Sequence, residues 1–326
     1  MVYVDDVLLA SKSKEDEERT ISDLRSCFKI KDLGEAEFYL GCHITRDRKE
    51  RTLTFDQHIY AETVAKRFNV SKTSMIPTAT GVKALSKEDG PKNSEEREEM
   101  SRVPYREAVG ALMWAATMTR PDLSFTAHNL AKFCDDPGPV HWEAVMKALQ
   151  YFWRTKNLGI TYGGGTSNDT KMSAYVDSDH ATCPDSRRSV SGGAVLLGSG
   201  AISWFSRAQR VTASASSESE YVALAEIVNE TKFLRQVQEF ILPNLRSYAI
   251  PIMEDNQGAI KMANNKHSSR RTRHIDVKHH VVRDAVEEGV VRIVYVRSED
   301  QHADILTKAL DMRSFESHAK VFMNAK

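Results

Sequence analysis

Hydrophobic and polar residues alternate along much of the C-terminal half of the chain. Residues 172–179 alternate as a strand does, and two further strand-like stretches, 189–198 and 201–205, flank a Gly-Ser-Gly turn. From Ser217 the apolar positions repeat with helical spacing. The later elements predicted in the same way are strands at 250–256 and 290–296 and helices at 257–264, 275–288 and from 302. This order predicts an α/β fold in which a mixed five-stranded sheet is flanked by helices.

The N-terminal part of the chain predicts a smaller α+β segment. An apolar strand opens the chain, and a charged helix at 13–27 follows it. Strand-like stretches near Ile44 and at 53–57 then precede a helix whose apolar positions include Ile59 and Val64.

The middle of the chain predicts helices without a catalytic cluster. A charged tract at 87–99 indicates an exposed linker or a solvated helix at a domain boundary. A helix from Tyr105 is expected to end before Pro121, because proline disfavours helical geometry in the residue before it. A second helix begins near Pro139. The Trp and Phe side chains of this part are expected in the core rather than as stacking platforms.

Composition narrows the classes of protein. The 326 residues suffice for two or three domains, and 45 basic and 45 acidic residues cancel, so a nucleic-acid-binding surface must be local. The four cysteines include no Cys-x-x-Cys pair, which argues for a reducing compartment and against a zinc site or a disulfide framework. No apolar run approaches the roughly 20 residues of a membrane-spanning helix, and no signal-peptide layout opens the chain. We therefore expect a soluble, intracellular protein with no membrane partner.

Two adjacent carboxylates, Asp5 and Asp6, interrupt the opening apolar strand. A buried strand tolerates such a pair only beside a cation, so a metal site is one interpretation. The other is a hairpin turn with two solvated aspartates, because aspartate is common in turns.

Four acidic residues of the C-terminal half are candidate metal ligands. Asp177 lies inside a predicted strand, Glu220 in the first turns of a helix, Asp255 at a strand end and Asp304 near a helix start. Each has a simpler explanation. Glu220 fits a capping box with Ser217, Asp255 an ordinary strand-to-turn junction, and Asp304 the positive end of a helix dipole. Four such coincidences in one ordered set, with an aspartate inside an apolar strand among them, favour a metal site.

Several ordered strings resemble those of copia-type LTR retrotransposon Pol polyproteins. They cover nearly the whole chain, from a Tyr-x-Asp-Asp turn of the reverse-transcriptase palm to a ribonuclease H domain. The strings lie at residues 3–6, 31–41, 120–122, 141–142, 175–179, 187–193, 216–221, 255–256, 271–276 and 301–308. The fold that the resemblance implies is a ribonuclease H-like domain preceded by a truncated palm and thumb and a helical connection.

The resemblance implies endonucleolytic cleavage of RNA in RNA–DNA hybrids. Asp177, Glu220, Asp255 and Asp304 would hold two Mg²⁺ ions, with Mn²⁺ as a substitute, and Asp177 would bridge both. One ion would activate the attacking water and the other would stabilise the leaving oxygen.

The densest positive run of the chain lies at 266–274 and continues to Lys278. Because it immediately precedes a predicted helix, we expect phosphate contacts rather than only a solvated surface. The residues expected to contact nucleic acid are Arg270, Arg271, Arg273, His274 and Lys278. His302, close to Asp304, is expected to be an ordinary helix-start residue.

The expected division is a truncated palm and thumb at 1–83, a linker at 84–104, a helical connection at 105–165, a ribonuclease H domain at 170–312 and a tail at 313–326. RNA-directed DNA polymerase activity is expected only of the parent polyprotein, because Asp5 and Asp6 lack the third palm carboxylate. The expected partners are an RNA–DNA hybrid and other products of the polyprotein. The expected location is cytoplasmic virus-like particles or the nucleus. The alternatives are a non-catalytic nucleic-acid-binding relic and an incomplete gene model of a longer polymerase.

Overall fold

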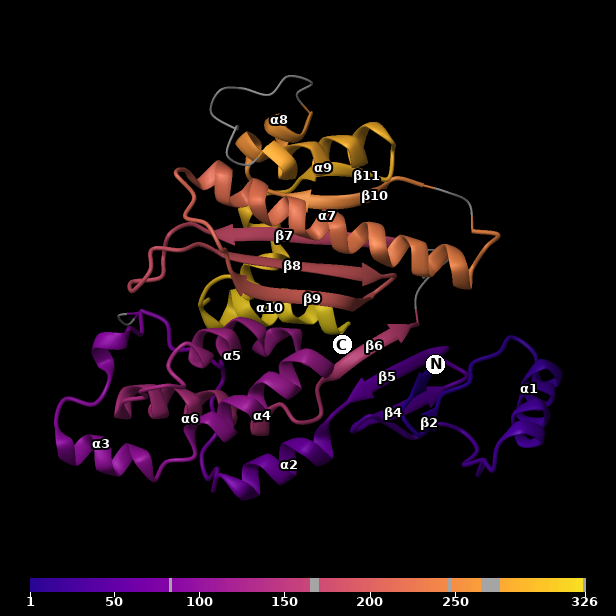
Figure 1. Ribbon diagram of the computed structural model, residues 1–326, viewed down its shortest axis with the longest axis horizontal. Helices are drawn as coiled ribbons and strands as arrows, with labels where there is room; N and C mark the ends of the chain where they lie inside the picture. Colours follow the sequence, from indigo (N-terminus) through magenta and orange to yellow (C-terminus); the bar gives the residue numbers. More distant parts are fainter. Residues whose placement is uncertain (82–83, 165–169, 246–247, 265–275, 325–326) are drawn as a thin grey trace.

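The computed structural model describes residues 1–81, 84–164, 170–245, 248–264 and 276–324, with side chains from His280 onward in the last range (Figure 1). The first part of the chain contains a two-stranded sheet of β1 and β2, three strands of a second sheet and two helices. Its elements are β1 (Val2–Tyr3), β2 (Asp6–Val7), α1 (Lys14–Cys27), β3 (Phe38–Tyr39), β4 (Cys42–Asp47), β5 (Thr52–Asp56) and α2 (His58–Arg67).

The middle of the chain is mostly helical and ends in one strand. Its elements are η1 (Lys87–Asp89), α3 (Ser94–Ser101), α4 (Tyr105–Met118), η2 (Pro121–Leu123), α5 (Ser124–Ala131), α6 (Pro139–Arg154) and β6 (Gly159–Gly163). β6 pairs antiparallel with β5, so this strand joins the first sheet, whose order is β3-β4-β5-β6.

The C-terminal part carries the large sheet that alternation predicts. Its elements are β7 (Met172–Asp179), β8 (Val190–Leu197), β9 (Gly200–Ala208), α7 (Ser216–Ile241), β10 (Ile250–Glu254), α8 (Gln257–Asn264), α9 (Asp276–Glu287), β11 (Val291–Tyr295), η4 (Ser298–Asp300), η5 (His302–Leu306) and α10 (Met312–Met323). The strand order is β11-β10-β7-β8-β9, with β7 to β9 antiparallel and β10 parallel to both β7 and β11. The predicted α/β class with a five-stranded mixed sheet is confirmed.

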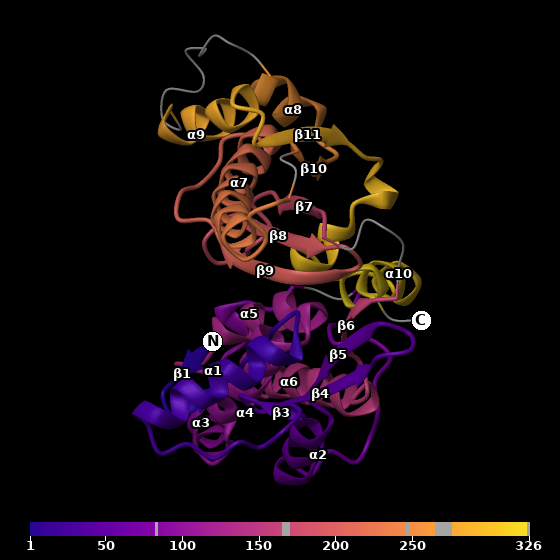
Figure 2. The ribbon, with the colours of Figure 1, turned by 90° about the vertical axis from the view of Figure 1, so that its right-hand side faces the viewer.

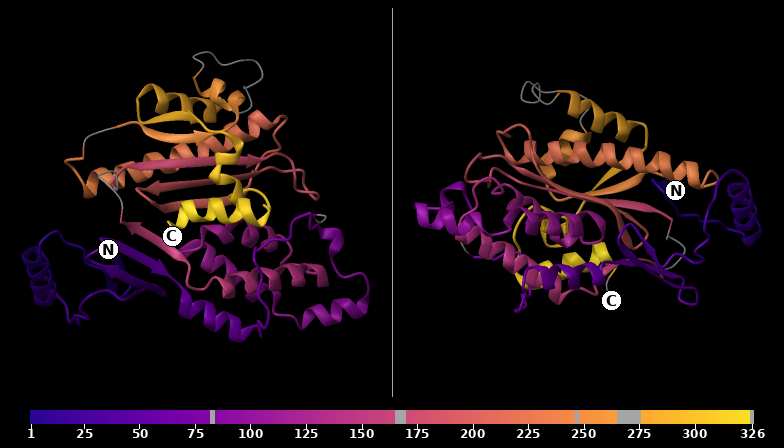
Figure 3. Two further views of the ribbon diagram at one scale, coloured as in Figure 1. Left: turned by 180° about the vertical axis from the view of Figure 1, so that it is seen from behind. Right: turned by 60° about the horizontal axis from the view of Figure 1, so that its bottom comes forward.

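Both faces of this sheet are buried, because successive side chains along its strands point into two different cores. Val195 of β8 belongs to a core formed with α7, whereas its neighbours Ala194 and Leu196 belong to a core shared with the middle helices and α10. Figure 1 shows α7 across one face of the sheet, and the left view of Figure 3 shows α10 on the opposite face. Figure 2 shows the large sheet above the middle helices.

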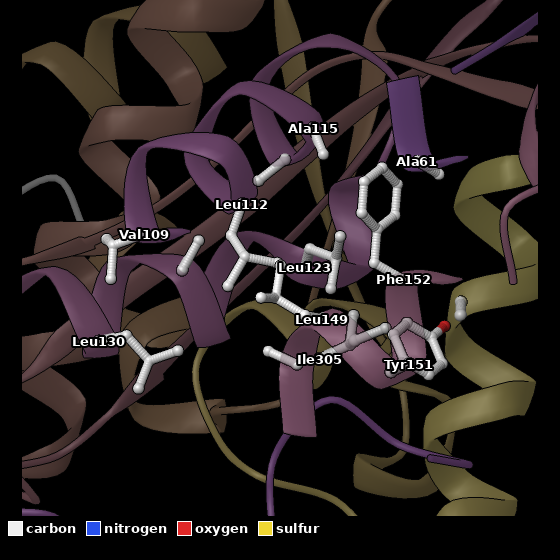
Figure 4. Packing of buried hydrophobic residues seen from close by; sticks show 14 of the residues in the cluster. Ala61, Val109, Leu112, Ala115, Leu123, Leu130, Leu149, Tyr151, Phe152 and Ile305 are labelled. Atoms are coloured by element: carbon white, nitrogen blue, oxygen red, sulfur yellow. The ribbon is translucent and has the colours of Figure 1, made fainter. Parts of the chain in front are cut away.

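The shared core joins segments that are far apart in sequence. Figure 4 shows Ile305 of η5 beside Leu123 and Leu149, which come from the middle of the chain. The middle helices are therefore packed against the C-terminal domain.

Two side chains differ from the sequence prediction. Ile59 is 49% exposed, because it lies on the outer face of α2, while Val64 on the same helix is buried. Trp114 is 43% exposed and is not in the core, because α4 buries the opposite face, where Leu112 and Ala115 lie.

The end of the chain also differs from the sequence prediction. The helix expected from residue 302 is the short 3-10 helix η5, and a separate helix, α10, follows it. Asp311 caps α10 by accepting hydrogen bonds from the backbone N–H groups of Arg313 and Ser314. Phe315 and Phe322, seven residues apart, bury one face of α10, so this segment is a packed helix.

Candidate active site

Three carboxylates from three separate elements converge at one end of the large sheet. Asp177 is near the end of β7, Asp255 follows β10, and Glu220 lies in the first turns of α7. Because β10 runs parallel to β7 beside it, the ends of both strands reach the same edge. One oxygen from each of the three side chains lies within 4.8 Å of the others. Oxygen ligands at this spacing could hold a divalent cation.

The fourth candidate, Asp304, lies in η5 next to this group. Lys308 Nζ is 2.9 Å from Asp304 Oδ1 and 4.0 Å from Asp177 Oδ2, so one ammonium group bridges the two carboxylates. Lys308 was not expected at the site. Its position four residues after Asp304 in a helical segment was the available signal.

Close packing of η5 against β8 holds Asp177 in place. Thr307 Oγ1 donates a hydrogen bond to Asp177 Oδ2, and the side chain of Thr307 is fully buried. Gly192 of β8 allows this approach, because a Cβ atom there would lie 2.6 Å from Thr307 Cγ2 and 2.7 Å from Leu306 Cβ. A larger residue at position 192 would push η5, and Asp304 with it, away from the sheet.

Burial and mutual repulsion raise the pKa values of these acids. Burial and then the neighbouring carboxylates, first Asp177, together raise the pKa of Glu220 to about 11. Burial followed by the charge of Asp177 raises the pKa of Asp304 to about 7, although Lys308 opposes this. Burial also raises the pKa of Asp177, against the effects of Lys308 and Thr307. A cluster of this kind needs additional positive charge before all its members can ionise.

A fifth carboxylate, Glu254, lies beside the site and was not expected from the sequence. Glu254 is completely buried at the end of β10, and its carboxylate accepts a hydrogen bond from the backbone N–H of Asn256 at 2.9 Å. Burial raises its pKa well above the ordinary value. Strand alternation was the available signal, because it turns the residue before Asp255 to the inside.

The simpler explanations for Glu220 and His302 can now be compared with the geometry. α7 begins after Ala215 without a side-chain cap, and Glu220 Oε2 has no hydrogen-bond partner among the described residues. The capping box is therefore absent. The ring of His302 lies at a tilt against Tyr175, with the centroids 4.8 Å apart, and shares a hydrogen bond of 2.9 Å with His318, which fits its expected structural role.

The remaining candidates lie outside the carboxylate cluster. Asp5 and Asp6 are exposed in the β1–β2 hairpin, and within the described part of the chain they belong to no group of three metal-binding side chains. Of the expected nucleic-acid contacts, Arg270, Arg271, Arg273 and His274 lie outside the described residues, and Lys278 lies in α9 where only the backbone is described. In the ranges that the structure describes, no helix is long and apolar enough to cross a membrane.

The raised pKa values predict that the metal-free protein loses stability as the pH rises. A carboxyl group of the unfolded chain has a pKa of about 4, whereas that of Asp304 in the native state is about 7. Between these values the native state binds more protons, so the free energy of unfolding falls as the pH rises through about 7. Urea unfolding should therefore show that the free energy of unfolding of Asp304→Asn rises relative to that of wild type by on the order of 1–2 kcal/mol between about pH 5 and pH 8.

Comparing Asp304→Asn with wild type removes the effects of other titratable groups on the pH dependence of stability. His128 and His318, whose pKa values burial lowers to about 4, act in the opposite direction below about pH 6.5. They contribute equally to wild type and variant. A difference that stays constant from acid to alkaline pH would contradict the proposed repulsion at Asp304.

The strand order β11-β10-β7-β8-β9 is that of the ribonuclease H-like fold expected from the sequence. Sequence comparisons with known proteins cover nearly the whole chain. The family model described as "Reverse transcriptase (RNA-dependent DNA polymerase)" matches residues 1–81. The Pol polyprotein from transposon TNT 1-94 of Nicotiana tabacum is 35% identical over 97% of this chain and 24% of its own length. That from transposon RE1 of Arabidopsis thaliana is 32% identical over 98% of this chain and 21% of its own length. Over nearly its whole length the chain is therefore homologous to part of copia-type retrotransposon Pol polyproteins.

The chain spans about a quarter or less of the length of these relatives. Among solved structures, LC11-RNase H1 in complex with an RNA/DNA hybrid is 15% identical, with a TM-score of 0.32, over 42% of this chain and 94% of its own chain.

Proposed function

We propose that residues 170–312 form a ribonuclease H that cleaves the RNA strand of RNA–DNA hybrids and leaves a 3′-hydroxyl and a 5′-phosphate. The observation that carries this proposal is the convergence of Asp177, Glu220 and Asp255 from three elements onto one buried, mutually repelling cluster. Lys308 contacts Asp304 and Asp177, but Glu220 Oε2 has no hydrogen-bond partner among the described residues and so is open to a further cation.

The four acids fit two divalent cations of the Mg²⁺ type, with Mn²⁺ as a substitute. Ions bound there would supply an activated water and stabilise the leaving oxygen. Asp177, held by Thr307, provides a fixed oxygen in the centre of the site. Lys308 neutralises Asp304 through its 2.9 Å contact and would have to move when a cation arrives.

The direct experiment is incubation of the purified chain with an end-labelled hybrid, with and without Mg²⁺. Cleavage of RNA paired to DNA, with duplex DNA left intact, supports the proposal, since recognition would depend on the 2′-hydroxyls. Absence of metal-dependent cleavage under conditions where the chain is folded and binds the hybrid would favour a second function, a non-catalytic nucleic-acid-binding module. The Lys308 ammonium beside Asp304 is the observation consistent with that second function.

Residues 1–81 would belong to the polymerase module, with Asp5 and Asp6 as its metal-binding turn. Because these aspartates lie exposed in a two-stranded hairpin, we propose that the chain by itself does not extend primers. RNA-directed DNA polymerase activity would belong to the parent polyprotein. The partners would be the hybrid and other polyprotein products, in cytoplasmic virus-like particles or the nucleus.

The basic run around residue 270 is the proposed phosphate contact. Replacing Arg270, Arg271 and Arg273 with alanine should weaken hybrid binding to a similar degree for all base sequences, because phosphate contacts read no sequence. The slope of log affinity against log salt should fall by about 2–3, close to one counterion for each lost contact. Fluorescence anisotropy at several salt concentrations measures both quantities.

A second triple variant controls for the loss of three positive charges. Arg97, Arg102 and Arg106 lie in the middle of the chain and form exposed ion pairs. Their replacement with alanine should leave the salt slope near that of wild type. Equal salt slopes for both triple variants would indicate that the basic run is only solvated surface.

A further inference from the structure

Two histidines and an aspartate meet at the corner between β4, β5 and α2, far along the chain from the carboxylate cluster. His43 lies in β4 and pairs in register with Asp56, the last residue of β5. His58 is the first residue of α2, two positions after Asp56. The sheet register and the tight strand-to-helix turn therefore bring all three side chains together.

The contacts in this His–Asp–His cluster converge on the Asp56 carboxylate. His43 Nδ1 is 3.1 Å from Asp56 Oδ2, and His58 Nδ1 is 2.5 Å from Asp56 Oδ1. The two imidazole rings meet edge to face, with their centroids 4.9 Å apart. Asp56 is buried, whereas about a third of each histidine side chain is exposed. The cluster thus has a buried anionic base and an open side.

The donor set is that of a transition-metal site. One nitrogen or oxygen from each of the three residues lies within 4.8 Å of the others. Tetrahedral zinc with bonds of about 2.0–2.1 Å places its ligands about 3.3 Å apart. The separation between His43 Nδ1 and Asp56 Oδ2, 3.1 Å, is close to this value. Two imidazoles and one carboxylate leave the fourth position to water, as in open zinc sites.

We propose that His43, Asp56 and His58 form a binding site for a divalent transition-metal ion of the Zn²⁺ type. Imidazole nitrogen suits zinc far better than it suits magnesium, so the ion differs from the one proposed for the carboxylate cluster. The cysteine pattern argued against a zinc site, but the ligands proposed here are two histidines and an aspartate that a strand pairing and a turn bring together.

Electrostatics supports an anionic ligand in the cluster. Burial acts to raise the pKa of Asp56, but hydrogen bonds from His58 and His43 outweigh it and leave the pKa below the ordinary value. Asp56 is therefore ionised at neutral pH. Its charge would offset part of the dication's charge.

Binding requires a change of tautomer in both rings. In the hydrogen-bonded state a neutral ring carries its proton on Nδ1 and donates a hydrogen bond from this N–H to the Asp56 carboxylate. When the ion takes the Nδ1 lone pair, that proton moves to Nε2 of the same ring, so a neutral ring releases no net proton. A bound ion would replace two hydrogen bonds with coordination bonds and would link the start of α2 to the β4–β5 hairpin.

The test is calorimetric titration of the full chain with Zn²⁺ in an Asp177→Asn, Glu220→Gln background, which removes ligands from the carboxylate cluster. One site is expected, and His43→Ala or His58→Ala should weaken it by at least about 100-fold, because even second-shell partners of a metal contribute about 10- to 100-fold. His280→Ala, an exposed histidine on α9, is the matched control and should bind as the background protein does. Mg²⁺ should not compete.

If a histidine variant unfolds, the site can still be tested by a measurement that leaves the His–Asp–His cluster unsubstituted. Zn²⁺ should protect His43 and His58 from diethyl pyrocarbonate, as read by mass spectrometry, and should leave His280 reactive. Unchanged zinc affinity in both histidine variants, or equal reactivity of His43 and His58 with and without Zn²⁺, would overturn the proposal. Neither outcome depends on hybrid cleavage.

Discussion

Asp177→Asn is expected to abolish metal-dependent cleavage of an RNA–DNA hybrid, with a loss of more than about 1,000-fold. Asp177 is nearly fully buried, and one of its carboxylate oxygens lies within 4.8 Å of oxygens of Glu220 and Asp255. Asparagine keeps the volume and can still accept the hydrogen bond from Thr307. The rate of hybrid cleavage at saturating Mg²⁺, measured in single turnover, tests this expectation.

Stability separates a chemical effect of Asp177→Asn from misfolding. Because burial raises the pKa of Asp177, removing its charge should leave the metal-free protein at least as stable as wild type near neutral pH. Asp179→Asn is the matched control on the same strand, outside the group of three convergent ligands, and should lower the rate less than about tenfold. Near-wild-type cleavage by Asp177→Asn with magnesium as the only divalent ion would remove Asp177 from the site.

The sequence makes Asp177 a candidate because the physical demand on this residue is local, whereas the other three acids became candidates through their order along the chain and the family resemblance. An aspartate inside an apolar strand, as at position 177, is costly unless a cation or hydrogen bonds stabilise it. Alternation and helical spacing likewise place β7, β8, β9 and α7 within a few residues of their observed bounds. These features depend on residues near one another in the chain.

Features that depend on tertiary contacts were not predicted. Lys308 reaches Asp177 only because η5 packs on β8 at Gly192, and Glu254 joins the site only because β10 is fully covered. His43 and Asp56 meet through the register of a hairpin, which a pattern of apolar residues does not specify for polar side chains. The division into domains stays a prediction.

A buried ion pair in the middle of the chain connects η2 with the C-terminal end of α6. Arg120 donates to both carboxylate oxygens of Asp122, at 2.9 and 2.7 Å, and both side chains are almost completely buried. The hydroxyl of Tyr151 donates to Asp122 at 2.6 Å, and Arg120 also donates to the backbone carbonyl of Thr155. Every group in this network has a partner, as buried charge requires.

Arg120→Met is expected to lower the free energy of unfolding by about 3–5 kcal/mol, because it leaves the Asp122 carboxylate buried without its counter-charge. Methionine retains much of the packing against Tyr151 and Phe152, whose rings lie 5.4 Å from the guanidinium carbon. The loss is thus mainly electrostatic. Urea unfolding followed by circular dichroism measures it, provided that the variant and wild type share one denaturant slope.

An exposed pair and a double variant make the expectation specific to burial. Arg97→Met breaks the exposed pair with Asp136 and should change stability by no more than about 1 kcal/mol. Adding Asp122→Asn to Arg120→Met removes the stranded charge, so the double variant should recover part of the stability lost by the single one. A double variant that is less stable than Arg120→Met by the full effect of Asp122→Asn alone would show that the two groups do not interact, contrary to the buried geometry.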